Sequence, residues 1–283
     1  MEGSAKKRPA EQRKLLLTVA FFVFLGLAVF SATQIVLSWR EYAVSGNEYD
    51  KLREMYEPPE DTAVAAAEPE DNATSDTEDQ PVAEIEENGP TEQQPSVPPP
   101  PSRDPREVNP EYIGWIKING TNISYPMAKG RDNEKYLTTS FEGYKRGLGA
   151  IFMDYRCSGD FEVYHSIIYG HNAKNGSMFG TLYKYRDEAY LEKNKDITIT
   201  LPSGEKQTWR IFAARKTDIN DHSYRLSFSG PESFATFALS LGAPEGTDRI
   251  ITLSTCTTGG SNDERMLVHA AILETTGADT DVE

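Results

Sequence analysis

The sequence is poor in cysteine and in the motifs that hold phosphates or metals. Cys157 and Cys256 are the only cysteines in 283 residues, so one disulfide at most can form. No glycine-rich phosphate loop, metal-ligand spacing or internal repeat occurs. The sequence therefore predicts an activity without cofactor or bound metal, and gives no reason to expect a nucleic-acid partner.

Positively charged residues are also scarce, and most of the excess negative charge lies in one segment. The chain has 29 Lys and Arg against 44 Asp and Glu, a net charge of −15. Residues 57–107 hold 15 of the acids and only two basic residues, Arg103 and Arg106. The same segment has 11 prolines and almost no large apolar side chains, so it cannot bury enough surface to offset the entropy of ordering. We expect residues 57–107 to be a disordered acidic linker that acts as a spacer.

A long uncharged run lies near the amino terminus. Residues 15–37 carry no charged side chain, and 23 residues at about 1.5 Å each can cross a hydrocarbon core of about 30 Å. A cleaved signal peptide is the alternative, but its apolar core would span about 7 to 15 residues. Basic residues crowd the preceding segment and only Arg40 follows closely, which predicts a cytoplasmic amino terminus. The expected order is a basic tail (1–14), a membrane anchor (15–37) and a juxtamembrane segment (38–56).

Short apolar strands dominate residues 108–275, the expected catalytic domain. Residues 114–118 and 121–125 alternate in polarity around Asn119-Gly120, a pair that favours a two-residue hairpin turn. The other segments with a strand pattern are 166–171, 196–201, 207–213, 249–256 and 265–273. Seven or eight short strands joined by turns predict a mainly β fold, and specifically a closed or nearly closed barrel.

One helix is expected inside this domain, before the strand that ends at Cys256. Pro231 suits a first helical position. Apolar residues then follow at helical spacing, namely Phe234, Phe237, Ala238 and Leu241. Other helices are expected to be few and short, and residues 276–283 form a C-terminal tail.

Three predicted strand ends carry side chains suited to catalysis. Cys256 ends one apolar run and Arg265 begins the next. If these two strands pair as an antiparallel hairpin, the thiol and the guanidinium meet at one edge of the sheet. His171 ends a third apolar run, residues 166–171. A cysteine, a histidine and an arginine at strand ends predict acyl transfer through a thiol.

Each of these residues also has a structural interpretation. Cys256 could be a buried cysteine, as is common for a lone cysteine in a strand. A disulfide with Cys157 would consume the nucleophile, and Cys157 is more simply an unpaired loop thiol. Arg265 could instead form an ion pair with Asp263 or Glu264. The histidines whose positions suit catalysis less well are His165, His222 and His269.

Several motifs, in this order, resemble one enzyme family. They are residues 132–137, residues 151–155, residues 168–172, Met178-Phe179, Thr252-Leu-Ser-Thr-Cys256 and residues 265–270. Together they resemble the catalytic domain of a class B sortase over roughly residues 108–275. Sortases are membrane-anchored cysteine transpeptidases, mainly of Gram-positive bacteria. The resemblance implies a sortase-type closed β-barrel of about eight strands, with the helix that begins at Pro231 as the class B insertion.

The resemblance also implies roles for individual residues. Cys256 would be the nucleophile, His171 the acid and base, and Arg265 the group that stabilises the thiolate and the oxyanion. The substrate groove would be lined by Asn133, Leu137, Tyr169 and Ser254, with Thr257 close to it. The implied reaction cleaves an Asn-Pro-x-Thr or Leu-Pro-x-Thr sorting motif of a surface protein after Thr. The acyl group then passes from the thioester to an amine of a lipid-linked peptidoglycan precursor, outside the cell membrane.

Three alternatives stay open at this point. The acceptor amine could be a pilin lysine, which would make the enzyme a pilus polymerase. A cysteine protease or amidase would pass the same acyl group to water. A non-enzymatic surface receptor would explain the anchor and the linker, but it would not explain Cys256, His171 and Arg265 together.

Overall fold

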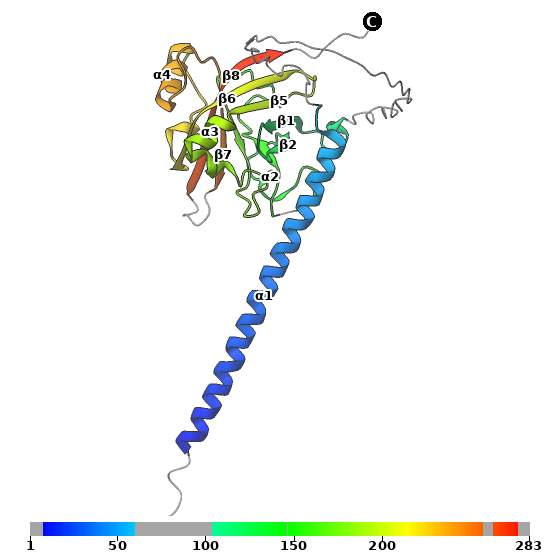
Figure 1. Ribbon diagram of the computed structural model, residues 1–283, viewed down its shortest axis with the longest axis vertical. Coiled ribbons are helices and arrows are strands. Elements are labelled where there is room, and N and C mark those ends of the chain that lie inside the picture. The colour runs from blue at the N-terminus through cyan, green and yellow to red at the C-terminus, as the bar shows by residue number, and fades with distance from the viewer. Residues whose placement is uncertain (1–7, 60–103, 146, 257–262, 277–283) are drawn as a thin grey trace, which may run out of the picture. The chain divides into compact units, whose positions relative to one another are not determined.

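A computed structural model of the protein describes residues 8–59, 104–145, 147–256 and 263–276 (Figure 1). Most of the expected acidic linker, Thr257 and residues 277–283 of the expected tail lie outside the described residues. The described residues include the whole of the expected barrel except residue 146 and the connection at 257–262.

Eight strands of the described chain form one closed barrel. They are β1 (Tyr112–Ile118), β2 (Ser124–Ala128), β3 (Ile151–Met153), β4 (His165–Tyr169), β5 (Asp196–Thr200), β6 (Lys206–Asp218), β7 (Ile250–Cys256) and β8 (Glu264–Thr276). Their order around the barrel is β1-β2-β3-β4-β7-β8-β6-β5, and β5 pairs with β1 to close it. The predicted closed barrel of about eight strands is confirmed.

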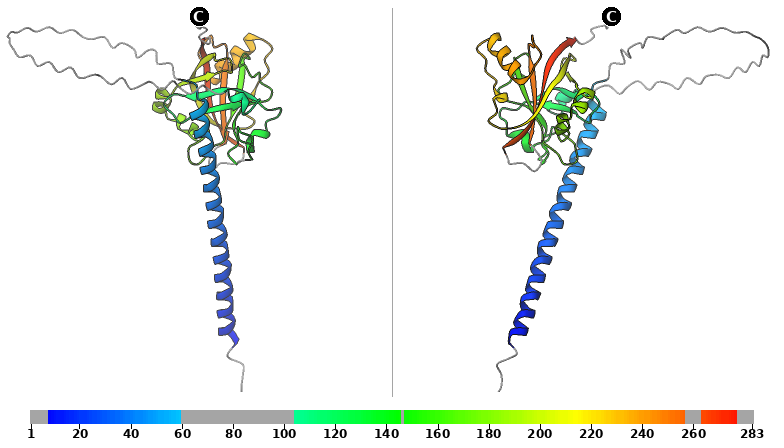
Figure 2. Two further views of the ribbon diagram at one scale, coloured as in Figure 1. Left: turned by 90° about the vertical axis from the view of Figure 1, so that its right-hand side faces the viewer. Right: turned by 60° about the vertical axis from the view of Figure 1, so that its left-hand side comes forward.

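The barrel is mixed in strand direction. β2 with β3 and β4 with β7 pair in parallel, whereas the other neighbours are antiparallel. The long strands β6 and β8, each of 13 residues, run side by side (Figure 2). The parallel pair β4 and β7 matters most for the site, because both strands then run toward the same end of the barrel.

The first hairpin has a wider turn than predicted. β1 ends at Ile118 and β2 begins at Ser124, so the connection is longer than the two residues Asn119-Gly120. The Thr121 hydroxyl donates to the Ile118 carbonyl at 2.8 Å and accepts from the Ile123 N–H at 3.1 Å. The prediction of a two-residue turn was wrong because a threonine side chain satisfies the backbone groups of a longer one.

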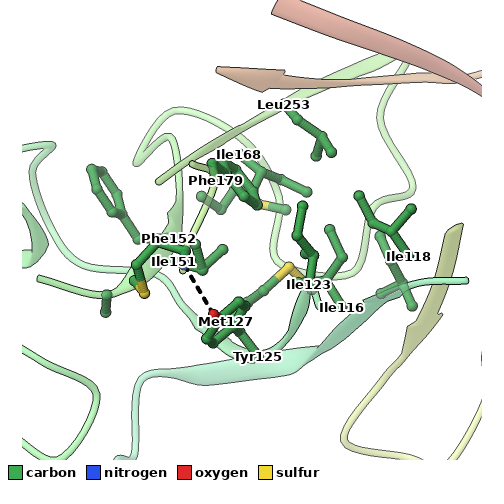
Figure 3. Packing of buried hydrophobic residues seen from close by; sticks show 14 of the residues in the cluster. Ile116, Ile118, Ile123, Tyr125, Met127, Ile151, Phe152, Ile168, Phe179 and Leu253 are labelled. Atoms are coloured by element: carbon green, nitrogen blue, oxygen red, sulfur yellow. Dashed lines mark hydrogen bonds between the residues drawn. The ribbon is translucent and has the colours of Figure 1, made fainter. Parts of the chain in front are cut away.

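Apolar residues from every strand fill the barrel interior. β5 shows the reason most clearly, since Ile197 and Ile199 are buried while their neighbours along the strand are partly exposed. Figure 3 shows side chains from β1, β2, β3, β4 and β7 packed together, among them Ile116, Met127 and Leu253. The Tyr125 hydroxyl, also in this cluster, accepts a hydrogen bond from the Met178 N–H at 2.9 Å. The core therefore extends beyond the strands into the segment that follows β4.

Helices are few, as expected. The short ones are η1 (Pro105–Glu107), α2 (Lys135–Thr138), η2 (Leu182–Arg186), α3 (Glu188–Lys193) and η3 (His222–Tyr224). The predicted helix before the Cys256 strand is α4 (Pro231–Leu241), with proline in its first turn. Its buried residues are the predicted stripe, Phe234, Phe237, Ala238 and Leu241. α4 ends at Leu241, and the next residue, Gly242, caps it with a φ of 91° in the left-handed conformation.

The first helix, α1 (Arg8–Tyr56), has two parts with different surroundings. Arg13–Leu37 is long and apolar enough to cross a membrane, and none of the segment that meets this test is buried. Nearer its end, α1 contacts β2, and Tyr49 and Leu52 are buried. The Tyr49 hydroxyl donates to the Gly149 carbonyl at 2.7 Å. The segment that the sequence suggested was juxtamembrane therefore also packs on the barrel.

Candidate active site

The site lies where β7 ends and β8 begins. The two strands pair antiparallel, and their register places Cys256 directly opposite Arg265. The predicted hairpin is therefore confirmed at the level of the backbone. The Cys256 side chain lies outside the described atoms, as does Thr257. Arg265 is half-buried, and its Nη1 donates to the Glu264 carbonyl at 2.9 Å.

His171 reaches the site through the parallel pairing of β4 with β7. β4 ends at Tyr169, two residues earlier than predicted, and Tyr169 pairs with Ser254. The Gly170 N–H extends the ladder by donating to the Ser254 carbonyl at 3.2 Å. Because parallel partners advance together, the residue two places beyond Tyr169 is level with the residue two places beyond Ser254. His171 and Cys256 are thus brought to the same height although 85 positions separate them.

The imidazole of His171 is oriented by a contact with the backbone. Its Nε2 lies 2.7 Å from the Leu137 carbonyl oxygen. A carbonyl oxygen can only accept a hydrogen bond, so Nε2 carries a hydrogen and donates it. In the neutral ring the proton-accepting atom is then Nδ1. This contact selects which nitrogen of His171 can exchange a proton with a reacting group.

A cavity of about 200 Å³ brings the predicted site residues together. Its lining consists of Asn133, Leu137, Phe152, Tyr169, Gly170, His171, Ser254, Thr255 and Arg265. We call it the strand-end cleft. All the predicted site residues are here except Cys256 and Thr257, whose side chains lie outside the described atoms. Leu137 is 42% exposed and offers an apolar contact to a ligand.

Asp154, which the sequence analysis did not propose as a site residue, holds one wall of the strand-end cleft. Its buried carboxylate accepts hydrogen bonds from Asn133 Nδ2 and the Tyr169 hydroxyl, both at 3.0 Å. Arg156 adds an ion pair at 2.8 Å. Burial acts to raise the pKa of Asp154, but the hydrogen bonds from Arg156, Asn133 and Tyr169 prevail and lower it to about 2. An acidic residue directly after an apolar strand was the signal available in the sequence.

The cleft residues are tied to their surroundings by further hydrogen bonds. Asn133 Oδ1 accepts from the Tyr155 N–H at 3.0 Å, so both ends of its amide are held. Burial raises the pKa of Tyr169, which stays a neutral donor to Asp154. Ser254 is buried, and its Oγ lies 2.8 Å from the hydroxyl of Tyr224. These contacts fix the positions of the side chains before any ligand arrives.

A buried chain of hydrogen bonds crosses β4, β7 and β8 beneath the site. His165 Nδ1 donates to the Arg225 carbonyl at 2.8 Å, and its Nε2 lies 2.7 Å from Thr252 Oγ1. The same hydroxyl lies 2.9 Å from His269 Nδ1. Burial lowers the pKa of His165 to about 4 and that of His269 to about 3. Both rings are therefore neutral structural groups, in line with the secondary rank that their sequence positions suggested.

Neither Cys157 nor a metal site contributes to the candidate active site in the described part of the chain. Cys157 is a free, buried thiol whose Sγ lies 3.9 Å from the His165 carbonyl oxygen, and burial raises its pKa. A protonated, buried thiol is a poor nucleophile. Within the described ranges, no group of three His, Cys, Asp or Glu side chains is placed to hold a metal ion.

Comparison with known proteins points to one family. The Sortase domain family matches residues 116–273. Sortase B of Staphylococcus aureus is 32% identical over 174 residues, which cover 58% of this chain and 71% of that protein. Sortase B of Listeria monocytogenes is 33% identical over 182 residues, 60% of this chain and 73% of that protein. The solved Staphylococcus aureus sortase B–substrate complex is 31% identical, with a TM-score of 0.55 over 60% of this chain and 83% of that chain.

The family match covers more than half of the chain, and the chain belongs to the sortase family of cysteine transpeptidases. The relatives named above are all sortase B proteins, so the class B resemblance drawn from the sequence is confirmed.

Proposed function

We propose that this enzyme cleaves a surface protein after the Thr of a sorting motif of Asn-Pro-x-Thr or Leu-Pro-x-Thr type. It then transfers the cleaved surface protein to an amine of a cell-wall precursor. The observation that carries the proposal is the strand-end cleft. It gathers His171 and Arg265 with apolar and hydrogen-bonding groups at the end of the strand that bears Cys256. A sortase B has been solved with its substrate, which is consistent with a peptide in this cleft.

In the first half-reaction, the Cys256 thiolate attacks the Thr carbonyl and a tetrahedral intermediate forms. Arg265 cannot lose its proton, so it serves as the charge that stabilises the thiolate and then the oxyanion. His171 protonates the leaving amine through Nδ1, because Nε2 is engaged with the Leu137 carbonyl. The C–N bond breaks, and the acyl group remains on sulfur as a thioester.

In the second half-reaction, an acceptor amine attacks the thioester carbonyl. The new N–C bond forms, the C–S bond breaks, and the sulfur leaves as a thiolate beside Arg265. The proton of the amine returns to the Nδ1 of His171, which is then ready for another cycle. Hydrolysis differs only in that water replaces the amine, so the acceptor decides between transpeptidase and protease.

The proposed location follows from the first part of α1. Arg13–Leu37 would anchor the protein in the cell membrane as a single span. The excess of Lys and Arg before this span favours a cytoplasmic amino terminus and a barrel on the outer side. Surface proteins and lipid-linked precursors are both accessible there.

The test uses the full-length protein in detergent with peptides that contain either sorting motif. Mass spectrometry of the products, with and without an added amine, separates transfer from hydrolysis. The Cys256→Ala variant should lose cleavage and thioester capture completely, because it lacks the nucleophile. Cys157→Ala is the control and should keep its activity, since that thiol is buried. Cleavage of more than a few per cent of the wild-type rate by Cys256→Ala would refute the mechanism.

A further inference from the structure

A second, larger cavity adjoins the strand-end cleft. Its volume is about 590 Å³, and Thr255, the residue before Cys256, lines both cavities. The wall of this second cavity comes from the segment that directly follows His171, from η2 and from single residues of β6, β7 and β8. We call it the basic groove, after the side chains Lys174, Lys184, Arg186 and Lys216 that line it.

The basic groove is lined by positive charge, whereas the chain as a whole is negatively charged. Four cationic side chains line it, and no Asp or Glu is found in its lining among the described residues. Lys216 pairs with Glu264 at 2.6 Å, and the Lys184 Nζ lies 5.7 Å from the centre of the Tyr190 ring. The chain as a whole carries −15. Cations that converge on a concave surface raise the local concentration of anionic ligands, so the groove favours an anion.

Thr255 supplies a second observation that points to a ligand. Its side chain is 3% exposed, and its Oγ1 has no hydrogen-bond partner in the described part of the chain. Buried hydroxyl groups are nearly always paired, so one without a partner calls for an explanation. A polar group of a ligand in either adjoining cavity would supply the missing partner.

We infer that the basic groove binds the anionic part of the acceptor molecule and thereby presents the acceptor amine to the thioester on Cys256. The inference rests on the proposed function, in which the sorting peptide occupies the strand-end cleft. The acceptor must then approach the same carbonyl from a neighbouring site, and the basic groove shares Thr255 with the cleft. The anion is a phosphate or a carboxylate, which the four cations bind through the same charge-assisted hydrogen bonds.

The same cations explain why the bound acceptor is reactive. A bare amine is mostly an ammonium ion at neutral pH, and positive charge nearby disfavours that form. The groove therefore repels a simple amine but admits one whose molecule carries compensating negative charge. Once bound, the amine is more readily deprotonated and attacks the carbonyl carbon. The N–C bond forms, the thiolate leaves, and the proton passes to His171.

The experiment measures transfer by the full-length protein in detergent, with a peptide that it cleaves. The two acceptors are triglycine, which has a free carboxylate, and triglycinamide, which does not. Inorganic diphosphate is added as a competitor to report phosphate binding. The test variant is Lys184→Gln/Arg186→Gln, and the matched control is Lys193→Gln, an exposed lysine of α3 outside the groove.

We expect the double variant to raise the KM for triglycine at least about fivefold, with hydrolysis unchanged, since two exposed charge contacts are lost. The difference in the KM for triglycine between the wild type and the double variant should disappear in about 1 M NaCl, where the Debye length is about 3 Å. A lower KM for triglycine than for triglycinamide identifies a carboxylate site. Competition by diphosphate in the wild type, lost in the double variant, identifies a phosphate site.

Equal KM values for the two acceptors together with no competition by diphosphate would overturn the inference. An unchanged KM for triglycine in the double variant, together with unchanged competition by diphosphate, would overturn it as well. Lys174→Gln, on the separate segment after His171, repeats the test if the double variant is unstable. Failure of the wild type to cleave either sorting peptide would instead refute the proposed function, so the two failures are distinguishable.

Discussion

The strand-end cleft and the basic groove meet at Thr255 but differ in the forces that they can exert on a ligand. The cleft, about 200 Å³, is built from residues held by buried hydrogen bonds, such as those from Asn133 and Tyr169 to Asp154. The groove, about 590 Å³, presents cations on exposed side chains. Side chains fixed by buried hydrogen bonds select by shape over short distances, whereas exposed charges attract over about a Debye length. Changes in the cleft should therefore resist salt, and changes in the groove should depend on it.

The largest effect is expected at Arg265, because the proposed mechanism uses it in both half-reactions. Arg265→Lys keeps the charge but loses the planar guanidinium, so kcat should fall by ~10²-fold for cleavage and for transfer alike. Stopped assays of both reactions at low and high salt would measure this. Arg210→Lys, on the exposed face of β6, is the control. Near-normal turnover would show that Arg265 is a structural residue and that cleavage and transfer do not share it as a catalytic group.

Acid should lower the stability of the fold around β7, the strand whose Thr255 lines both cavities. Burial lowers the pKa of His165 to about 4, whereas an unfolded histidine titrates near 6.5. Above about pH 6.5 both states are neutral, and as the pH falls toward 4 only the unfolded state gains the proton. The free energy of unfolding should therefore drop by about 2 kcal/mol between pH 7.5 and pH 5 from this residue alone. His269 adds to the loss, because its pKa is lowered to about 3.

Chemical denaturation at the two pH values checks this expectation. His165→Gln should flatten the pH dependence, while His222→Gln, an exposed histidine, should leave it unchanged. Because Thr252 bonds to both buried rings and lies on β7, acid should impair cleavage and transfer together. Loss of only cleavage or only transfer at pH 5 would show that the two cavities do not both depend on the hydrogen bonds of Thr252 to His165 and His269.

Asp154→Asn should act on the strand-end cleft alone. The change weakens the carboxylate contacts to Asn133, Tyr169 and Arg156, so the KM for the sorting peptide should rise by about tenfold. The acceptor KM should not change. The native carboxylate stabilises the fold above its unfolded pKa of about 3.9, and this contribution fades as the pH falls through about 2. Asp248→Asn, an exposed acid, is the control, and an equal rise in both KM values would contradict the separation of the cavities.

The smallest effect is expected where α1 packs on the barrel. Tyr49→Phe removes the hydrogen bond to the buried Gly149 carbonyl and should lower the free energy of unfolding by about 1–2 kcal/mol. A cavity beside Tyr49 is also lined by Asn175, which belongs to the basic groove. Tyr49 itself lines neither the strand-end cleft nor the basic groove, so both KM values should shift by no more than about twofold. Thermal denaturation and steady-state kinetics measure these effects, with Tyr144→Phe, a change at an exposed tyrosine, as the control. A large change in only one KM would show that α1 supports only the corresponding cavity.

Local patterns predicted the parts of the fold that depend on local contacts. The alternation of residues 196–201 identified β5, and the apolar stripe from Phe234 to Leu241 identified α4, because burial of one face imposes its period on the sequence. The pairing of Cys256 with Arg265 followed from the short connection between two strands. The turn at Asn119-Gly120 was predicted too short, because the hydroxyl of Thr121 competes with backbone pairing.

The sequence by itself determined the strands, the long apolar segment near the amino terminus, the family and the residue types needed for thiol chemistry, since each is a property of neighbours along the chain. Only the tertiary structure decided how distant segments meet. The parallel pairing of β4 with β7 carries His171 to the level of Cys256, and β3 delivers Asp154 to the side chains of Asn133 and Tyr169. The cations of the basic groove are spread over residues 174–216 and form no motif, so only the closing of the barrel gathers their charge beside Thr255.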